Sequence, residues 1–409
     1  MSQNDLLHRS GVPLDEVDLI RSDIFHDHSY LDLFEDLREM HPVHLQTHPL
    51  SGSFWNISRY KDVAYVDSNH NLFSSQGSIV IDDTHVNFPL KMFIAMDPPA
   101  HSEIRSQFDP VFTGRSIARY EDSIRDRTAT ILDKLPVNEE FDWVKRVSTE
   151  LAIQMLADLL NFPHKDRHKL ARWSDIASAA RDNSGLVASD KHREKELMEC
   201  FEYFTQLRRV RDDDDTERDL TGMLTYEGDV KRMLPSEELG NLLLLIVAGN
   251  DTTRNSMSGG VHLLSSNPEQ FIKVRDDQSL IPGMVSEIIR HQTPLAYMRR
   301  TALVDVELGG KIIRAGDKVV MWYVSANMDE AVFKKPRQFI VDRPNVNKHL
   351  AFGIGIHRCI GARLALLQLR VLWEEIYKRF GKIEVIKEPC YINSSFIKGY
   401  HSMTTILQK

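Results

Sequence analysis

The segment 352–361, which reads Phe-Gly-Ile-Gly-Ile-His-Arg-Cys-Ile-Gly, constrains this chain more than any other part of the sequence. An amphipathic helical pattern follows it, with Ile360, Leu364, Leu367 and Val371 on one apolar face. We therefore expect Cys359 at the N-terminus of a helix, where free backbone N–H groups and the helix dipole favour a thiolate. The three glycines of the segment allow tight turns and let a flat cofactor approach without Cβ clashes.

Two simpler interpretations of Cys359 are weaker. A lone buried cysteine is usually a small core hydrophobe. A zinc site built on His357 and Cys359 needs two more ligands at suitable spacing, and none is nearby in the sequence. Neither interpretation accounts for three glycines around one cysteine. A haem whose iron is bound by the Cys359 thiolate accounts for all of them.

Bulk properties set wider limits. With 409 residues, 42% of them hydrophobic and 27% charged, the chain can form a large core. Length alone suggests two or three domains, but no Gly/Ser/Pro-rich linker separates folding units, so we expect a single domain over residues 1–409. The net charge of −8 argues against a nucleic-acid partner. The acidic run from Arg211 to Asp219 predicts a solvated loop.

The ends and the cysteines indicate the compartment. No basic segment followed by an apolar one opens the chain, so no signal peptide is expected. The longest apolar run, Leu242 to Ala248, is too short for a membrane anchor. Cys200, Cys359 and Cys390 are odd in number and far apart, which argues against a disulfide framework. We expect a soluble, cytoplasmic protein.

Helical periodicity dominates and predicts a mainly α fold with a minor β portion. Helices are predicted over 116–135, 142–160, 193–209, 236–264 (with Ser236 as N-cap), 280–291 and 360–380. Strand signals are fewer and cluster late, at 304–308, 311–313, 318–324, 382–386 and 404–407. Gly309-Gly310 marks a hairpin between the first two of these strands.

The pattern Phe-Gly-x-Gly-x-His-x-Cys-x-Gly resembles the haem-ligand loop of the cytochrome P450 monooxygenases, and further landmarks of this family follow in order over essentially the whole chain. The resemblance implies the P450 fold, a triangular helical prism with haem b (iron protoporphyrin IX) between the long central helix and the helix after the cysteine. It implies a monooxygenase that inserts one oxygen atom of O2 into a small hydrophobic substrate. Within the family the chain resembles soluble bacterial members.

The resemblance also assigns roles to residues. Cys359 is the metal ligand, and the other cofactor-binding residues are His101, Arg105, Arg300, Phe352, His357 and Gly361. Spacing leaves open whether Arg299 or Arg300 contacts the haem propionate. Asp251 and Thr252, in a long helix whose Ala-Gly-Asn-Asp-Thr-Thr segment suits a helix interior poorly, match the catalytic oxygen-activation pair. Glu287, Arg290 and Arg343 match a buried structural Glu–Arg–Arg cluster.

The substrate-binding residues implied by the resemblance are Leu244, Val247, Ala248, Leu295, Met298, Phe396 and Ile397. An apolar pocket indicates a hydrophobic substrate and little more. Segments 248–260, 298–302 and 362–375 resemble the bacterial terminal hydroxylases of alkanes and fatty acids, which favours medium-chain alkanes, fatty acids or related lipophiles; a terpenoid or other cyclic lipophile is the alternative.

Electrons are expected from a separate ferredoxin, which an NAD(P)H-dependent ferredoxin reductase reduces. Arg358, Arg363 and Arg370 are candidates for docking it, although propionate or core-edge roles fit them equally well. Two further functions are less favoured. An H2O2-driven peroxygenase of this family would lack the acid–alcohol pair Asp251-Thr252, and a haem sensor would not require it.

Overall fold

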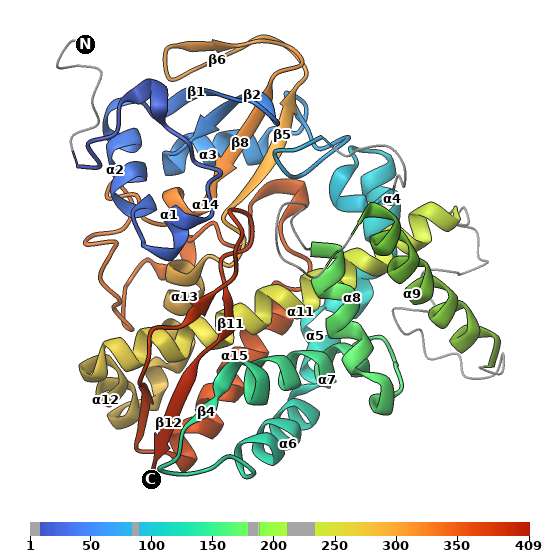
Figure 1. Ribbon diagram of the computed structural model, residues 1–409, viewed down its shortest axis with the longest axis vertical. Helices are drawn as coiled ribbons and strands as arrows, with labels where there is room; N and C mark the ends of the chain where they lie inside the picture. Colours follow the sequence, from blue (N-terminus) through green and yellow to red (C-terminus); the bar gives the residue numbers. More distant parts are fainter. Residues whose placement is uncertain (1–8, 84–89, 179–186, 188, 211–233) are drawn as a thin grey trace.

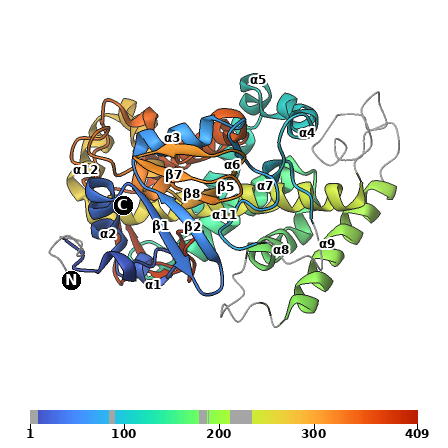
Figure 2. The same cartoon turned by 90° about the horizontal axis from the view of Figure 1, so that it is seen from above.

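The computed structural model describes residues 9–83, 90–178, 187, 189–210 and 234–409. A twisted sheet with small helices occupies one end, and a larger helical part surrounds the long helix α11 (Pro235–Ser266) (Figure 1). Seen from above, α11 extends across the molecule below the sheet (Figure 2). The run from Arg211 to Asp219 lies outside the described residues.

The helices range from single turns to the long α11. In chain order they are α1 (Asp23–His26), α2 (Tyr30–Met40), α3 (Tyr60–Ser68), α4 (Ala100–Phe108), α5 (Gly114–Ala118), α6 (Glu121–Leu132), α7 (Thr149–Leu159), α8 (His168–Ser178), α9 (Asp190–Val210), α11, α12 (Pro268–Asp276), α13 (Ile281–Gln292), α14 (Tyr323–Ala326) and α15 (Ala362–Arg379).

The strands form one larger sheet and three small ones within the described part of the chain. They are β1 (Val43–His48), β2 (Gly52–Ile57), β3 (Phe73–Ser74), β4 (Phe141–Asp142), β5 (Tyr297–Ala302), β6 (Val306–Leu308), β7 (Lys311–Ile313), β8 (Lys318–Trp322), β9 (Lys382–Val385), β10 (Cys390–Tyr391), β11 (Tyr400–Ser402) and β12 (Thr404–Gln408). The larger sheet has the order β1-β2-β8-β5-β3, in which β2 and β8 pair in parallel and the other neighbours pair antiparallel.

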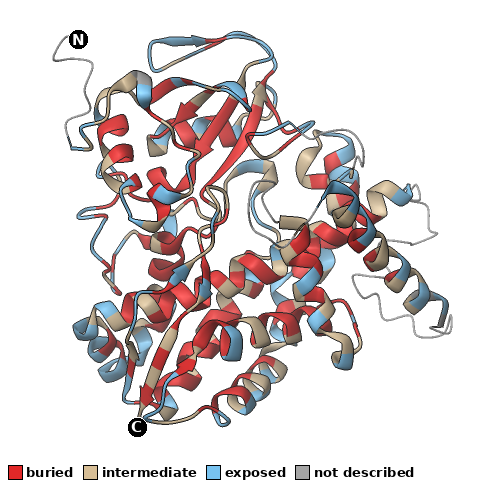
Figure 3. Cartoon of the chain, viewed as in Figure 1, coloured by how far each residue is buried: buried red, intermediate tan, exposed pale blue. Residues whose placement is uncertain are grey.

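The largest hydrophobic cluster surrounds α11 and draws on α6, α7, α13 and α15. Because α11 is covered on most sides, the majority of its central residues are buried (Figure 3). Two smaller clusters lie on the sheet, one with α1 and α2 and the other with α3. Among the described helices, none is both long and apolar enough to span a bilayer.

The mainly α prediction is confirmed, but several bounds were wrong. The stretch 116–135 divides into α5 and α6, because Thr113 caps a separate short helix by accepting a hydrogen bond from the Ser116 N–H. The stretch 142–160 begins instead with a π-helical turn, Val144–Ser148, before α7.

The predicted start of the long helix also needs correction. Its N-cap is Leu234 and not Ser236, because Pro235 has no N–H to satisfy at the first helical position and the Glu237 carboxylate accepts the Leu234 N–H at 2.9 Å.

The expectation that strands cluster late holds for β5 to β12, but it misses the early strands β1 to β4. The β1–β2 hairpin is early in the chain, and its polar residues, such as His44 and Gln46 of β1, face inward, so no hydrophobic alternation marks it. Strand β8 ends at Trp322, two residues earlier than predicted, because α14 begins there.

Candidate haem site

The loop before Cys359 is held in a closed turn. The Cys359 N–H donates to the Phe352 carbonyl at 2.8 Å. Gly353 and Gly355 have φ values of +64° and +76°, which L residues with a Cβ rarely adopt. A Cβ on Gly355 would also lie 2.8 Å from the Asp67 carbonyl oxygen, so the end of α3 packs directly against this loop. Both glycines are therefore required by backbone conformation or by close packing.

The Cys359 side chain is accessible to solvent, yet protein surrounds it on many sides. A thiol that faces an internal hollow has both properties. Burial raises its pKa, and the backbone N–H of Gly361 opposes this most, together with the charges of Arg105 and Arg358. The expected effect of the helix N-terminus is therefore present, but burial outweighs it in the free thiol. A cation bound to the sulfur would supply further compensation.

His101 on α4 and His357 in the loop meet although they are far apart in the sequence. Their ring centroids are 4.2 Å apart, and their four buried ring nitrogens form no hydrogen bond with the described part of the chain. Burial lowers the pKa of both rings, that of His357 to about 2. Buried polar atoms without protein partners indicate groups that serve a ligand.

Arg105 and Arg300 lie close enough to this pair to lower the pKa of His357 further, after the larger effect of burial. Arg105 donates to the Arg358 carbonyl at 2.8 Å, and Arg300 pairs with the buried Asp67 at 2.8 Å. The neighbouring Arg299 faces away, because it donates to the Ile81 carbonyl at 3.1 Å and pairs with Asp83 at 2.7 Å. Of the two adjacent arginines, Arg300 is therefore the one beside the Cys359 loop.

The middle of α11 carries further predicted site residues, among them Ala248 and Thr252. Ala248 is exposed although Ile246 and Asn250 beside it are buried, so this face of the helix borders open space instead of packed core. One turn later, the half-buried Thr252 donates from its hydroxyl to the Ala248 carbonyl at 2.8 Å. This contact ties up the carbonyl within the helix and leaves the hydroxyl oxygen able to accept a second hydrogen bond.

Asp251 is buried and held by three donors on one oxygen. Its Oδ1 accepts hydrogen bonds from the Ser174 hydroxyl at 3.0 Å, the Asn250 amide at 2.9 Å and the Arg254 guanidinium at 3.0 Å. Its Oδ2 accepts none from the described residues. Burial raises the pKa of this carboxyl, and Arg254 partly counters the effect. Arg254 also pairs with the more exposed Asp175 at 3.1 Å, which links the buried acid to the outside of α8.

Four of the seven predicted substrate residues lie together. Leu295, Met298 and Phe396 belong to one hydrophobic cluster, and Ile397 is bridged to Leu295 by backbone pairing. Leu244 packs against the separate cluster around α11. The half-buried Val247 and the exposed Ala248 lie on the same helix as Leu244 and belong to neither of these clusters.

Glu287, Arg290 and Arg343 form the predicted buried cluster. Arg290 donates to Glu287 at 2.7 and 2.8 Å, and Arg343 donates to it at 3.1 and 3.0 Å. Both arginines also hold backbone carbonyls of the segment 334–338, which precedes the Cys359 loop in the chain.

The donor set fits haem b. One thiol is accessible to solvent, glycines line its loop, and two histidines with two arginines converge beside it, as two propionate carboxylates require. Among the described residues, no group of three or more His, Cys, Asp or Glu side chains is arranged to hold a metal ion, which leaves His357 and Cys359 without the additional ligands that zinc needs.

The sequence interpretation missed three side chains of the site. Arg254 follows Asp251 by three residues and could have been found from helical spacing. Ser174 and Asp67 come from other elements and carry no local signal.

Comparisons with known proteins agree with this geometry. A family model described as Cytochrome P450 matches residues 128–395. The chain is 31% identical to a linalool 8-monooxygenase of Pseudomonas putida (96% of this chain, 99% of that protein) and 33% identical to a methyl-branched lipid omega-hydroxylase of Mycobacterium tuberculosis (85% and 83%). A solved structure, CYP153D17 from Sphingomonas sp. PAMC 26605, is 44% identical, covers 95% of this chain and 98% of its own, and superposes with a TM-score of 0.90.

Proposed function

The chain belongs to the cytochrome P450 family and is a monooxygenase with haem b, and we propose that it hydroxylates a medium-chain alkane, fatty acid or related aliphatic lipophile at the terminal carbon. The observation that carries the proposal is the apolar set Leu295, Met298 and Phe396 together with the exposed Ala248 of α11. A surface of this kind has no donor or acceptor to orient a polar substrate, so shape decides which carbon reacts.

Two relatives support a lipophilic substrate. One carries the name of an omega-hydroxylase of methyl-branched lipids, and another that of a linalool 8-monooxygenase. The first name describes oxidation at the end of a lipid chain, which is the reaction proposed for this protein. The linalool relative keeps a terpenoid open as the second candidate, because it covers almost the whole of this chain.

Each residue of the site has a role in this proposal. Cys359 would hold the iron of the haem, and His101, Arg105, Arg300 and His357 would bind its propionates, with Phe352 covering the sulfur and Gly361 allowing close approach. Haem supplies the activation of O2. Thr252 would accept a hydrogen bond on the exposed side of α11, and Asp251 would relay a proton toward it; burial raises the pKa of the Asp251 carboxyl, which favours uptake of the proton that it passes on.

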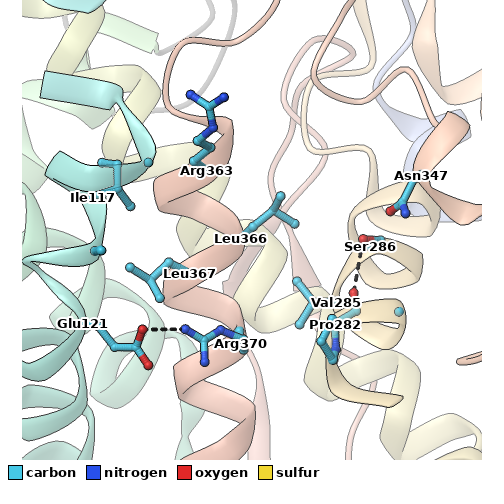
Figure 4. A pocket seen from close by; sticks show the side chains of 13 residues that line it. Ile117, Glu121, Pro282, Val285, Ser286, Asn347, Arg363, Leu366, Leu367 and Arg370 are labelled. Atoms are coloured by element: carbon cyan, nitrogen blue, oxygen red, sulfur yellow. Dashed lines mark hydrogen bonds and ion pairs between the residues drawn. The ribbon is translucent and has the colours of Figure 1, made fainter. Parts of the chain in front are cut away.

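We further propose that a ferredoxin supplies the electrons and docks on the Cys359 side. A pocket of about 530 Å³, which does not include Cys359 among its lining residues, lies on this side between α5, α6, α13 and α15 (Figure 4). Apolar side chains such as Ile117 and Leu366 line it, and Arg363 stands at its rim. Arg370, one of the three candidates for docking, is paired with Glu121 at 2.7 Å and Glu374 at 2.9 Å, so Arg363 and Arg358 are the better candidates.

The test uses substrate-induced change in the spin state of the ferric haem, followed by product analysis. We expect a low- to high-spin shift with n-alkanes and fatty acids of medium length, and mainly terminal alcohols as products. Ala248→Leu should shorten the preferred chain, whereas Thr130→Leu on the exposed face of α6 should leave the preference unchanged. A response to cyclic terpenoids alone would overturn the aliphatic assignment, and full turnover with H2O2 and no ferredoxin would overturn the electron source.

A further inference from the structure

Asp67, at the end of α3, is a buried carboxylate whose hydrogen bonds reach the Cys359 side of the molecule. Its side chain is 1% exposed. It accepts hydrogen bonds from Arg300 at 2.8 Å, from the Tyr323 hydroxyl at 2.8 Å and from the Ile354 N–H at 2.9 Å. These three donors come from β5, from α14 and from the Cys359 loop. One carboxylate therefore joins three elements at the candidate haem site.

The backbone around Asp67 meets the same loop. A Cβ on Gly353 would lie 3.2 Å from the Asp67 carboxylate and 3.5 Å from the Tyr323 hydroxyl, while one on Gly355 would lie 2.8 Å from the Asp67 carbonyl oxygen. The contact between α3 and the loop thus leaves little room for a side chain on either glycine. Because the fit is this tight, a displacement of Asp67 is transmitted to the loop that carries Cys359.

Asp67 also fixes the direction of Arg300. One terminal nitrogen of this guanidinium donates to Asp67, and the other donates to the Arg299 carbonyl at 2.9 Å. Arg300 is 3% exposed, so without Asp67 its charge would lose its buried counter-charge. Burial raises the pKa of Tyr323 far above its ordinary value and Asp67 adds to the rise, so the hydroxyl keeps its proton and remains a donor to the carboxylate.

We propose that Asp67 is a positioning residue of the haem site: it sets the orientation of Arg300 and the Ile354 amide, and its charge tunes the reduction potential of the haem. The inference rests on the proposed contact of Arg300 with a propionate, but not on the proposed substrate. The negative charge of Asp67 lies on the side of the site where Arg300 is positive. Removing the negative charge of Asp67 makes the local charge around the haem site more positive, which favours the reduced state of the iron.

The experiment compares Asp67→Asn with Asp62→Asn in the purified haem-loaded protein. Asp62 is a second buried aspartate of α3 (7% exposed), and its side chain forms no hydrogen bond with the Cys359 loop within the described part of the chain. For Asp67→Asn we expect a more positive reduction potential and transfer of haem to apomyoglobin that is about ten-fold faster or more, in line with the loss of an outer hydrogen bond to a metal site. For Asp62→Asn we expect neither change.

A third variant separates charge from hydrogen bonding. Tyr323→Phe removes one donor and keeps both charges, so we expect faster haem transfer with an unchanged potential. If Asp67→Asn lowers the melting temperature of the haem-free protein but moves neither the potential nor the transfer rate, Asp67 is only structural and the proposal is wrong. If Asp67→Asn does not fold, an unchanged transfer rate in Tyr323→Phe overturns it. The thiolate-type spectrum and the substrate-induced spin shift of each variant report the proposed function separately.

Discussion

Replacing Glu287 by Ala should destabilise the protein far more than removing an exposed carboxylate. Glu287 accepts four hydrogen bonds from two arginines and a fifth from the Ile340 N–H at 3.1 Å. Glu287 and Arg290 are fully buried, and Arg343 is 5% exposed. The alanine variant leaves two buried guanidinium groups next to each other without the carboxylate that joins them.

Breaking a buried charge cluster in this way costs about 3–5 kcal/mol, whereas an exposed ion pair contributes about 0–1 kcal/mol. Glu140, which pairs with Lys387 at 3.0 Å with both side chains more than half exposed, offers the matched control. With a urea dependence of roughly 3 kcal/mol/M, Glu287→Ala should lower the midpoint of urea unfolding by about 1–1.5 M, and Glu140→Ala by about 0.3 M or less.

The assay is urea unfolding of haem-loaded protein, followed by far-UV circular dichroism and by haem absorption. Since Arg290 and Arg343 hold the carbonyls of 334–338 ahead of the Cys359 loop, we also expect the alanine variant to be purified with less haem. Glu287→Gln keeps the volume but loses the charge and should fall between the two. Equal midpoints for Glu287→Ala and Glu140→Ala would refute the reasoning about buried charge.

Three further outcomes are expected. Cys359→Ser should abolish the thiolate-type absorption of the reduced, CO-bound protein, while Cys200→Ser should leave it intact; a retained spectrum would remove Cys359 as the ligand. Asp251→Asn should slow product formation by about 10²–10⁴-fold at an unchanged substrate-induced spin shift, because proton delivery is lost and binding is not; native turnover would contradict the relay. Burial lowers the pKa of His44 to about 4, whereas an unfolded-state histidine has a pKa of about 6.5. The unfolded chain therefore takes up a proton first as the pH falls. The stability that depends on the neutral ring is complete above about pH 6.5 and is lost as the pH falls toward 4. Between about pH 7 and pH 5 the free energy of unfolding should drop by about 2 kcal/mol more in the native protein than in His44→Gln, and equal drops in the two would show that His44 is protonated in the folded state.

On its own, the sequence predicted those contacts of the site whose two residues lie close together in the chain, and it missed contacts between distant residues. The Cys359 loop and the pair Glu287–Arg290 are local, so their residue types and spacing carry the signal. Arg343 pairs with Glu287 from 56 positions away and was expected only through the family resemblance. Asp67 meets Arg300 across 233 positions and Ile354 across 287, and nothing near it in the sequence distinguishes it from Asp62.

Strand prediction was also incomplete, because it depends on the hydrophobic pattern and not on the distance between partners in the sequence. The hairpin of β6 and β7 was predicted from its two glycines, which turn the chain at φ values of +58° and +73°. The β1–β2 hairpin was missed because its inward side chains are partly polar and find partners inside, as Gln46 does when it donates to Asp18 at 2.9 Å. Hydrophobic alternation predicts a strand only where the covering layer is apolar.

The two sides of the site differ in how strictly sequence determines function. On the Cys359 side, directional contacts require particular residues, so the haem site follows from a few positions. On the substrate side, packing is non-directional, and a single methylene of substrate is worth only about 1–3 kcal/mol in an apolar pocket. Terminal attack must overcome the lower strength of internal C–H bonds, so small changes in pocket shape can move the reaction along the chain.

Ala248 is the position where such a change acts most directly, because its side chain is the exposed one on the central face of α11. Enlarging it narrows the space beside the helix, whereas shortening Met298, another of the proposed substrate residues, should leave more room for the substrate. In Met298→Ala we therefore expect the product to shift from terminal to internal alcohols. This variant enlarges the space for the substrate, whereas Ala248→Leu reduces it.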